Sequence, residues 1–317
     1  MWEETVLHRF GVARDGTNPV AGLLLKNQVL YGTTLNGGNN DAGVVFSLDR
    51  SGETILYSFS GQGTDGANPA GGVIFDRQGE FAGTTTQGGD EDVGTVFTLT
   101  PSGDLWQHTT IHNFHQFQDG YDPMDGLIMS DDGTLYATTA KGGRSLDGVV
   151  FSMSRNETDW NFTTLYSFDP HGNDGIFSTA SLILGSTGLL YGTTAFGGGH
   201  NSESNGTVFS LTLDGAETLL YSFTGGVDGS APMSGVVMDG AGNIYGTTSA
   251  GGKFGQGVIF KLTPQRDGAY RETVLHHFTG QADGGTPMGG LLLYHGALYG
   301  TTSAGGQSSH GVVFKIE

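Results

Sequence analysis

The sequence predicts an all-β protein, a six-bladed β-propeller built from four-stranded antiparallel blades. One phrase, Leu-Tyr-Gly-Thr-Thr followed by Gly-Gly and then by Gly-Val-Val-Phe, returns along the whole chain. Each copy contains four short apolar segments separated by turn residues. The mean repeat, 317 residues divided by six or about 53 residues, is the length of a four-stranded propeller blade.

The composition agrees with this fold class. The chain has 317 residues and 57 of them are glycine, far above the usual share of about 7%. The glycines have no three-residue period, which excludes collagen, and the apolar β-formers between them exclude a disordered chain. Cysteine is absent, so disulfides, thiolate zinc sites and cysteine nucleophiles are excluded.

The charge balance restricts the possible partners. The formal net charge is −19, which disfavours nucleic acid and anionic membrane surfaces and weakly favours neutral or cationic ligands. No apolar run approaches the ~18 residues of a membrane helix. The first residues do not resemble a signal peptide, so any leader is expected to lie outside this sequence. We expect a monomer.

Six landmarks define the repeat, and two of them are the most regular. The phenylalanine that ends the Gly-x-Val/Ile-Phe segment is Phe46, Phe97, Phe151, Phe209, Phe260 and Phe314. The aspartate of an Asp-Gly pair is Asp15, Asp65, Asp119, Asp174, Asp228 and Asp283.

The elements of one repeat follow in a fixed order. In the first copy, strands are expected near residues 22–25, 30–34, 43–48 and 53–59. The first and third are almost continuously apolar, as in strands buried on both faces. Glycine within the second strand predicts close approach of a neighbouring backbone or aromatic ring.

The two ends of the chain predict how the fold closes. The sequence begins with a fourth strand over residues 4–10 and ends with a third strand over residues 311–316. Pairing of these terminal strands would complete the last blade, with residues 1–10 supplying its missing strand. We therefore predict a single domain over residues 1–317.

These linked phrases resemble the GloVer tandem repeat, and the resemblance covers essentially the whole chain. That family occurs in large, secreted or surface-anchored bacterial proteins. The resemblance therefore implies an extracellular or cell-surface setting. The family has no established catalytic residues, so none is carried over to this sequence.

Residues present in every repeat are interpreted as structural. Asp before Gly caps a turn by bonding nearby backbone, and Gly accepts positive φ. A ring of cation or ligand sites made by the six aspartates is the alternative. We predict no cofactor and no metal, and leave a structural calcium ion open.

Function is sought where the repeat is broken. After Asp174 the usual proline-bearing loop is replaced by Ile176-Phe177-Ser178, and in the same repeat the segment from Gly198 to Gly206 is longer than its equivalents. Sequence drift is the competing explanation. The residues selected on this basis are, as catalytic candidates, Glu203, His200, His171 and Asp122, and, as ligand-binding candidates, Tyr121, Lys141, Arg144, Phe177 and Asp92.

Two functions remain open at this point. The first is an extracellular binding module that recognises carbohydrate, or another small neutral ligand, on the loop face around the central channel. Aromatic loop residues could stack on sugar rings there. The second is a polysaccharide-degrading enzyme, a glycoside hydrolase or a lyase, with its site in the second to fourth blades. Carboxylates beside histidine are the side chains such chemistry uses.

Overall fold

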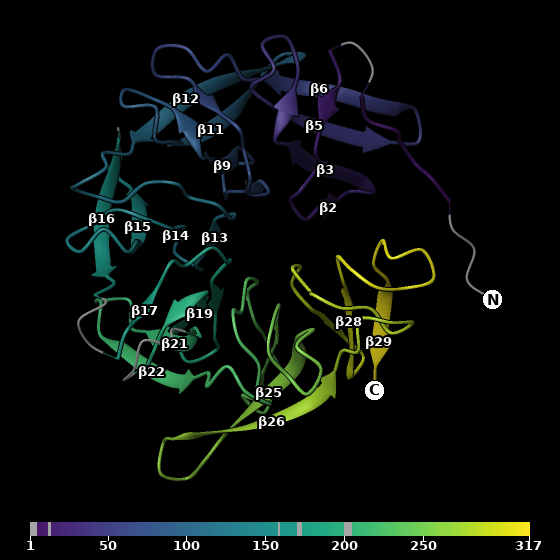
Figure 1. The fold of residues 1–317 in the computed structure, drawn as a ribbon. Coiled ribbons are helices and arrows are strands. Elements are labelled where there is room, and N and C mark those ends of the chain that lie inside the picture. Colours follow the sequence, from purple (N-terminus) through teal and green to yellow (C-terminus); the bar gives the residue numbers. More distant parts are fainter. Residues whose placement is uncertain (1–4, 12–13, 158, 170–172, 200–204) are drawn as a thin grey trace. The chain divides into compact units, whose positions relative to one another are not determined.

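The computed structural model describes residues 5–317 except 12–13, 158, 170–172 and 200–204. Within these ranges every regular element is a β-strand. The structure confirms an all-β, six-bladed propeller class (Figure 1). Contacts divide the chain into two compact units, residues 1–142 with 151–163, and residues 143–150 with 164–317. The expected single domain over 1–317 stays a prediction.

Each blade is an antiparallel sheet whose strands follow sequence order. The strands of the blades are β2 (Leu24–Lys26), β3 (Val29–Thr34), β5 (Val44–Asp49) and β6 (Gly52–Ser58); β8 (Ile74–Phe75), β9 (Phe81–Thr85), β11 (Thr95–Ser102) and β12 (Leu105–Asn113); β13 (Ile128–Met129), β14 (Leu135–Thr139), β15 (Val149–Arg155) and β16 (Trp160–Ser167); β18 (Ile183–Leu184), β19 (Leu190–Thr194), β21 (Thr207–Leu211) and β22 (Glu217–Ser222); β23 (Val237–Met238), β24 (Ile244–Thr248), β25 (Val258–Pro264) and β26 (Tyr270–His277); β27 (Leu292–Tyr294), β28 (Ala297–Thr301) and β29 (Val313–Ile316).

Short two-stranded ladders tie the loops at one end of the blades. They are β1 (Gly16–Thr17) with β4 (Asn36–Gly37), β7 (Gly66–Ala67) with β10 (Gln87–Gly88), and β17 (Gly175–Ile176) with β20 (Phe196–Gly197). Single bridges replace them in other blades, as between Tyr121 and Lys141. These ladders hold the Asp-Gly loop against the Gly-Gly loop, so both have a defined backbone.

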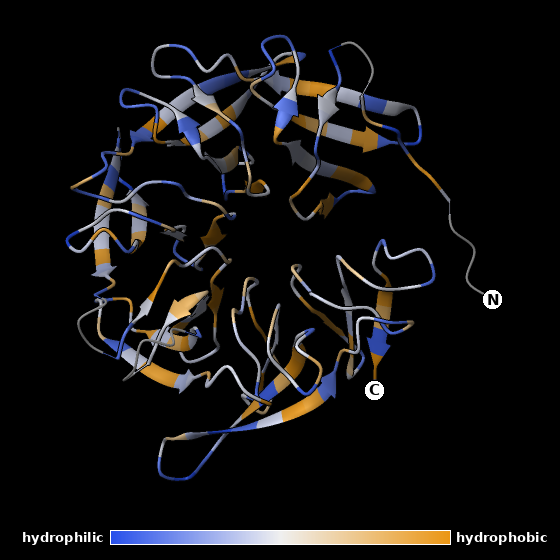
Figure 2. Ribbon diagram, viewed as in Figure 1, coloured by the Kyte–Doolittle hydropathy of each residue, from blue (hydrophilic) through white to orange (hydrophobic). Residues whose placement is uncertain are grey.

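The third strand of a blade is buried on both faces, as its apolar sequence predicts. In β5 the consecutive residues Val44, Val45 and Phe46 are all buried. Figure 2 shows the contrast with the turns: β25 and β26 carry apolar stretches, whereas the hairpin joining them is hydrophilic. Burial of alternate side chains on opposite faces requires a blade or another element on each side of the strand.

Glycine in the second strand makes room for an aromatic ring. Gly246 pairs with Phe260 across β24 and β25, and a Cβ at Gly246 would lie 2.5 Å from Cζ of that ring. The same relation joins Gly192 to Phe209 at 2.6 Å. The prediction of a close approach at these glycines is confirmed.

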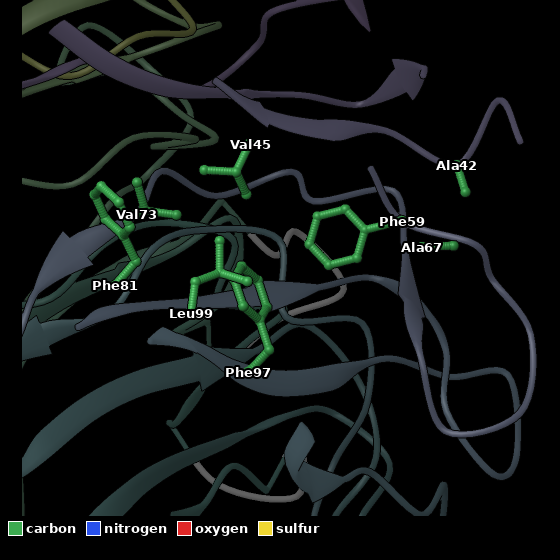
Figure 3. Packing of buried hydrophobic residues seen from close by; sticks show 8 residues of the cluster. All are labelled: Ala42, Val45, Phe59, Ala67, Val73, Phe81, Phe97 and Leu99. Atoms are coloured by element: carbon green, nitrogen blue, oxygen red, sulfur yellow. The ribbon is translucent and has the colours of Figure 1, made fainter. Parts of the chain in front are cut away.

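Phenylalanines form the contacts between successive blades. Phe59, which follows β6, packs edge-on against Phe97 of β11, with 5.1 Å between the ring centroids. Figure 3 shows these two rings with Val45, Val73 and Leu99 in one buried cluster. Phe223 and Phe260 repeat the arrangement at 5.1 Å. Edge-to-face pairs of this kind add to the free energy gained from apolar burial.

The described residues 5–10 depart from the strand expected over residues 4–10. Residues 5–10 form no strand, although Phe10 packs on Phe46 with the ring centroids 5.1 Å apart. The last sheet contains three strands, and Val313 of β29 is 81% exposed. A strand needs a neighbour for its backbone N–H and C=O groups. Pairing of the two termini therefore stays a prediction.

Candidate functional site

One residue of every repeat has a left-handed backbone, and its side chain varies from blade to blade. These residues are Asn18 (φ 59°), Asn68 (φ 56°), Asp122 (φ 62°), Phe177 (φ 61°), Ala231 (φ 54°) and Thr286 (φ 50°). Asn and Asp tolerate this conformation because their short polar side chains bond locally. A bulky or β-branched side chain in this region, such as that of Phe177 or Thr286, is strained.

The same backbone hydrogen bonds hold this position in different blades. The Phe177 N–H donates to the carbonyl of Asp147 at 3.1 Å, and the Phe177 carbonyl accepts from the N–H of Ala195 at 3.0 Å. Asn68 makes the equivalent bonds to Ala42 and Thr86 at 2.8 and 3.1 Å. The backbone is therefore constant, and the side chain is available for a function specific to one blade.

Phe177 carries the clearest signal of such a function. Its ring lies 5.8 Å from that of Phe196, tilted by 44°, and Phe196 is 42% exposed. The two rings lie beside each other because Ile176 pairs with Phe196 in the β17–β20 ladder. The missing proline marked Phe177 in the sequence. Its strain and its aromatic neighbour are visible only in the structure, and strain of this kind gathers at functional sites.

The structure also brings Tyr121, Asp122 and Lys141 together, at the loop end of the third blade. The Lys141 ammonium donates to Oδ2 of Asp122 at 3.0 Å, and Nζ lies 5.9 Å from the centre of the Tyr121 ring. Lys141 is 43% exposed on its side chain. A carboxylate, an ammonium and a phenol within one patch offer both donors and acceptors to a hydroxyl-rich ligand.

Asp92 and Arg144 have local structural partners. Oδ1 of Asp92 accepts the N–H of Gly88 at 2.9 Å, as Asp41 does from Gly37 at 2.8 Å. The backbone N–H of Arg144 donates to Oγ of Ser167 at 2.9 Å. Asp92 therefore caps its Gly-Gly loop, and the exposed Arg144 side chain is placed by a turn. His171, His200 and Glu203, three of the catalytic candidates, lie outside the described residues.

The Asp-Gly aspartates cap their loops, as the sequence predicts. Oδ2 of Asp174 accepts the N–H of Asp169 at 2.9 Å, and Oδ1 accepts the N–H of Gly175 at 2.7 Å. Asp228 accepts the N–H of Thr224 at 2.8 Å. Charge-assisted bonds from backbone N–H groups fix the turn.

Sequence reasoning missed what else surrounds these aspartates. A tyrosine or histidine from the preceding fourth strand bonds several of them, and a glutamate of the next blade lies close to three. Burial and, after it, the neighbouring Asp174 carboxylate raise the pKa of Glu217 to about 7. Burial, together with Asp15 and Asp228 respectively, raises the pKa of Glu53 and of Glu272 to about 7. The sequence does contain a signal for these glutamates, because each one begins the repeated segment Glu-Thr-x-Leu-Tyr/His.

Solved structures resemble this chain in fold at low sequence identity. A protein of Thermus thermophilus, proposed to be an oxidoreductase (glucose dehydrogenase), has a TM-score of 0.56 at 14% identity and covers 96% of this chain and 98% of its own. PpgL, a periplasmic gluconolactonase of Pseudomonas aeruginosa, has a TM-score of 0.54 at 15% identity, covering 96% of this chain and 85% of its own. An ancestral GH74 enzyme has a TM-score of 0.57 at 11% identity, with 91% and 40% covered. At these identities the likeness shows the fold alone.

Two further comparisons were made with curated proteins and with protein-family models. A search of curated proteins found no match to the sequence. No helix in the described ranges is long and apolar enough to cross a membrane. The family model of the Gloeobacter/Verrucomicrobia repeat matches residues 2–203 and again 159–317. The matches together span almost all of the sequence, and the chain belongs to the Gloeobacter/Verrucomicrobia repeat family.

Proposed function

We propose that this protein binds neutral carbohydrate on the loops at one end of its blades, outside the cytoplasm. The single observation that carries the proposal is the left-handed backbone of the aromatic residue Phe177. The residue keeps a strained φ of 61° in a position where two other blades use asparagine. Strain of this kind costs about 1–3 kcal/mol and persists where a function requires it.

The chemistry of the neighbouring ring supports a sugar ligand. Phe196 exposes its ring beside Phe177, and flat apolar faces match the C–H face of a pyranose. Ligand sites combine such surfaces with a few placed polar groups. Separately, the patch formed by Tyr121, Asp122 and Lys141 offers polar groups in another blade, and we propose it as a second contact region in its own right.

The net charge supports a neutral polysaccharide as the ligand, and the family supports a location outside the cytoplasm. A net charge of −19 disfavours uronate-rich polyanions and leaves neutral polysaccharides. A secreted or cell-surface location is the setting in which such polymers are met, and it agrees with the resemblance of the repeat to surface proteins. The similar periplasmic gluconolactonase and ancestral GH74 enzyme act as precedent for the fold in carbohydrate chemistry.

The test is a binding panel with matched variants. Neutral β-glucans, mannans and xylans are compared with pectate and alginate by affinity electrophoresis, and hits are measured by calorimetry. Phe177→Asn, which installs the residue of other blades, is expected to weaken binding at least tenfold, or about 1.4 kcal/mol. Phe196→Ser is expected to do the same.

The control lies at the opposite end of a blade. Tyr294, 57% exposed in the β27–β28 hairpin, is replaced by Ala and should leave affinity unchanged. Retained affinity in Phe177→Asn, or no binding to any neutral glycan, would contradict the proposal.

The enzyme alternative is followed in the same samples. Reducing ends and the ultraviolet absorbance of unsaturated products are recorded with each polysaccharide. Turnover that disappears in Glu203→Gln or His200→Ala would replace the binding proposal by a hydrolase or lyase. Saturable binding without product would count against the enzyme.

A further inference from the structure

Three side chains, from the N-terminal segment, the loop that follows it and β6 of the first blade, converge on one point. Nε2 of His8 lies 3.2 Å from Oδ2 of Asp15 and 3.6 Å from Oε2 of Glu53. One ligand atom from each residue lies within 4.8 Å of the other two. Bonds of 2.0–2.2 Å in a tetrahedron place ligand atoms about 3.3–3.6 Å apart. The two separations from the imidazole of His8, 3.2 and 3.6 Å, agree with a zinc-sized site.

The Asp15 side chain is buried and held in place, and the Glu53 and His8 side chains are partly buried. The Asp15 side chain is 4% exposed, and its carboxylate accepts the N–H groups of Gly16 at 2.7 Å and Gly11 at 3.2 Å. The Glu53 side chain is 11% exposed. His8 packs edge-on against Phe10, with 4.6 Å between ring centroids. Such supporting contacts orient ligands before a metal arrives.

Glu53 has an unsatisfied carboxylate oxygen, as do Glu217 and Glu272 in two other blades, but only Glu53 also has a histidine beside it. Its Oε1 atom is buried and has no hydrogen-bond partner. An unpaired buried carboxylate oxygen is costly, particularly beside the second carboxylate of Asp15. The single imidazole of His8 is shared between both carboxylates, so it satisfies neither fully. A divalent cation would satisfy both.

Other described blades lack at least one of the three ligands. In the fourth and fifth blades the place of His8 is taken by Tyr166 and Tyr221, whose phenols donate to Asp174 at 2.8 Å and to Asp228 at 3.0 Å. Burial raises the pKa of both phenols, which keeps them hydrogen-bond donors. The second and third blades lack the glutamate, since His108 and Phe162 lie near Asp65 and His112 respectively.

We propose that His8, Asp15 and Glu53 bind a zinc ion. Two carboxylates and one neutral imidazole balance the charge of Zn²⁺, and a water completes the tetrahedron. Zinc is preferred to calcium because Ca²⁺ takes six to eight oxygen ligands. The ion would fix residues 5–11, which have no strand partner, to the loop that follows them and to β6.

The test measures zinc binding to the whole chain, with no histidine tag. The protein is stripped with a chelator and titrated with Zn²⁺ at pH 7 in competition with a chromophoric chelator, and calcium is titrated in parallel. One tight zinc site is expected, with at least a hundredfold weaker binding in Glu53→Gln and in His8→Tyr. His8→Tyr reproduces the residue of other blades, so it is expected to fold, which circular dichroism checks.

Matched controls distinguish zinc binding at this site from non-specific zinc binding to the acidic surface of the protein. Glu217→Gln alters the equivalent glutamate of a blade without the histidine and should leave zinc affinity unchanged. Co²⁺ in place of zinc should give the visible absorption of a tetrahedral site, lost in His8→Tyr. The proposal is overturned if no site saturates, if calcium binds as tightly, or if His8→Tyr and Glu53→Gln bind zinc like the parent chain.

Discussion

The phenol of Tyr166 donates a hydrogen bond of 2.8 Å to Oδ2 of Asp174. The bond joins the end of the third blade to the loop that enters the fourth, where Glu217 of β22 approaches the same carboxylate. Tyr221, Asp228 and Glu272 repeat the arrangement in the next blade, with a bond of 3.0 Å. A largely half-buried pair of acids is therefore a recurrent part of the contact between blades.

The first prediction concerns pH. Burial and the adjacent aspartates raise the folded-state pKa of Glu217 and Glu272 from 4.5 to about 7. Since the unfolded state loses these protons first, their contribution to stability is complete below about pH 4.5 and is lost as pH rises through 7. Glu217→Gln with Glu272→Gln should therefore raise the free energy of unfolding at pH 8 relative to the parent, and much less at pH 4.5.

Urea unfolding across this window measures the difference between variant and parent. Glu157→Gln, a change at an exposed glutamate, is the control and should leave the difference near zero. A variant that is destabilised equally at pH 4.5 and pH 8 would contradict the linkage.

The second prediction concerns the phenols. Tyr166→Phe leaves Asp174 without one of its donors, and hydrogen bonds to charged groups contribute about 1.5–3 kcal/mol. We expect a loss of that size in the free energy of unfolding at pH 7. Tyr294→Phe, at an exposed tyrosine, should cost less than about 0.5 kcal/mol. Equal losses in the two variants would show that the Tyr166–Asp174 hydrogen bond does not stabilise the fold as predicted.

The third prediction concerns the glycine of the second strand. The Cβ of Gly246→Ala would lie 2.5 Å from the Phe260 ring, and overpacking of a close contact costs about 1–3 kcal/mol. At Gly240 no atom lies within 4 Å and φ is not positive, so Gly240→Ala should be neutral or slightly stabilising. Thermal unfolding of the two variants tests whether contact with the Phe260 ring is the reason that position 246 requires glycine.

The fourth prediction concerns the strained aromatic. Phe177→Asn places a residue that tolerates the left-handed region at φ 61°. We expect the melting temperature to rise, by an amount equivalent to about 1 kcal/mol. Asn68→Phe, the reverse exchange at φ 56°, should lower it. Destabilisation by Phe177→Asn would mean that the ring is held for packing and would weaken its assignment to a ligand.

Much of the fold could be predicted from the repeat. The positions of Gly246 and Phe260 in the phrase are enough to anticipate a close pair, because strand pairing brings repeated landmarks into a fixed register. The same periodicity separated capping aspartates such as Asp174 from residues that differ between blades. Tyr121 and Lys141 were selected separately in the sequence, and the structure places them on one bridge.

The sequence by itself determined the number of repeats, the class of each strand and the position where Phe177 breaks the pattern, because these follow from local periodicity and turn chemistry. Only the tertiary structure decided that Glu53 meets His8 and Asp15, that Glu217 lies beside Asp174, and that Phe177 is strained next to Phe196. It also left residues 5–10 without the strand expected there. Contacts between blades join residues far apart in the chain, and backbone strain depends on hydrogen bonds from several loops, so neither is encoded in any one repeat.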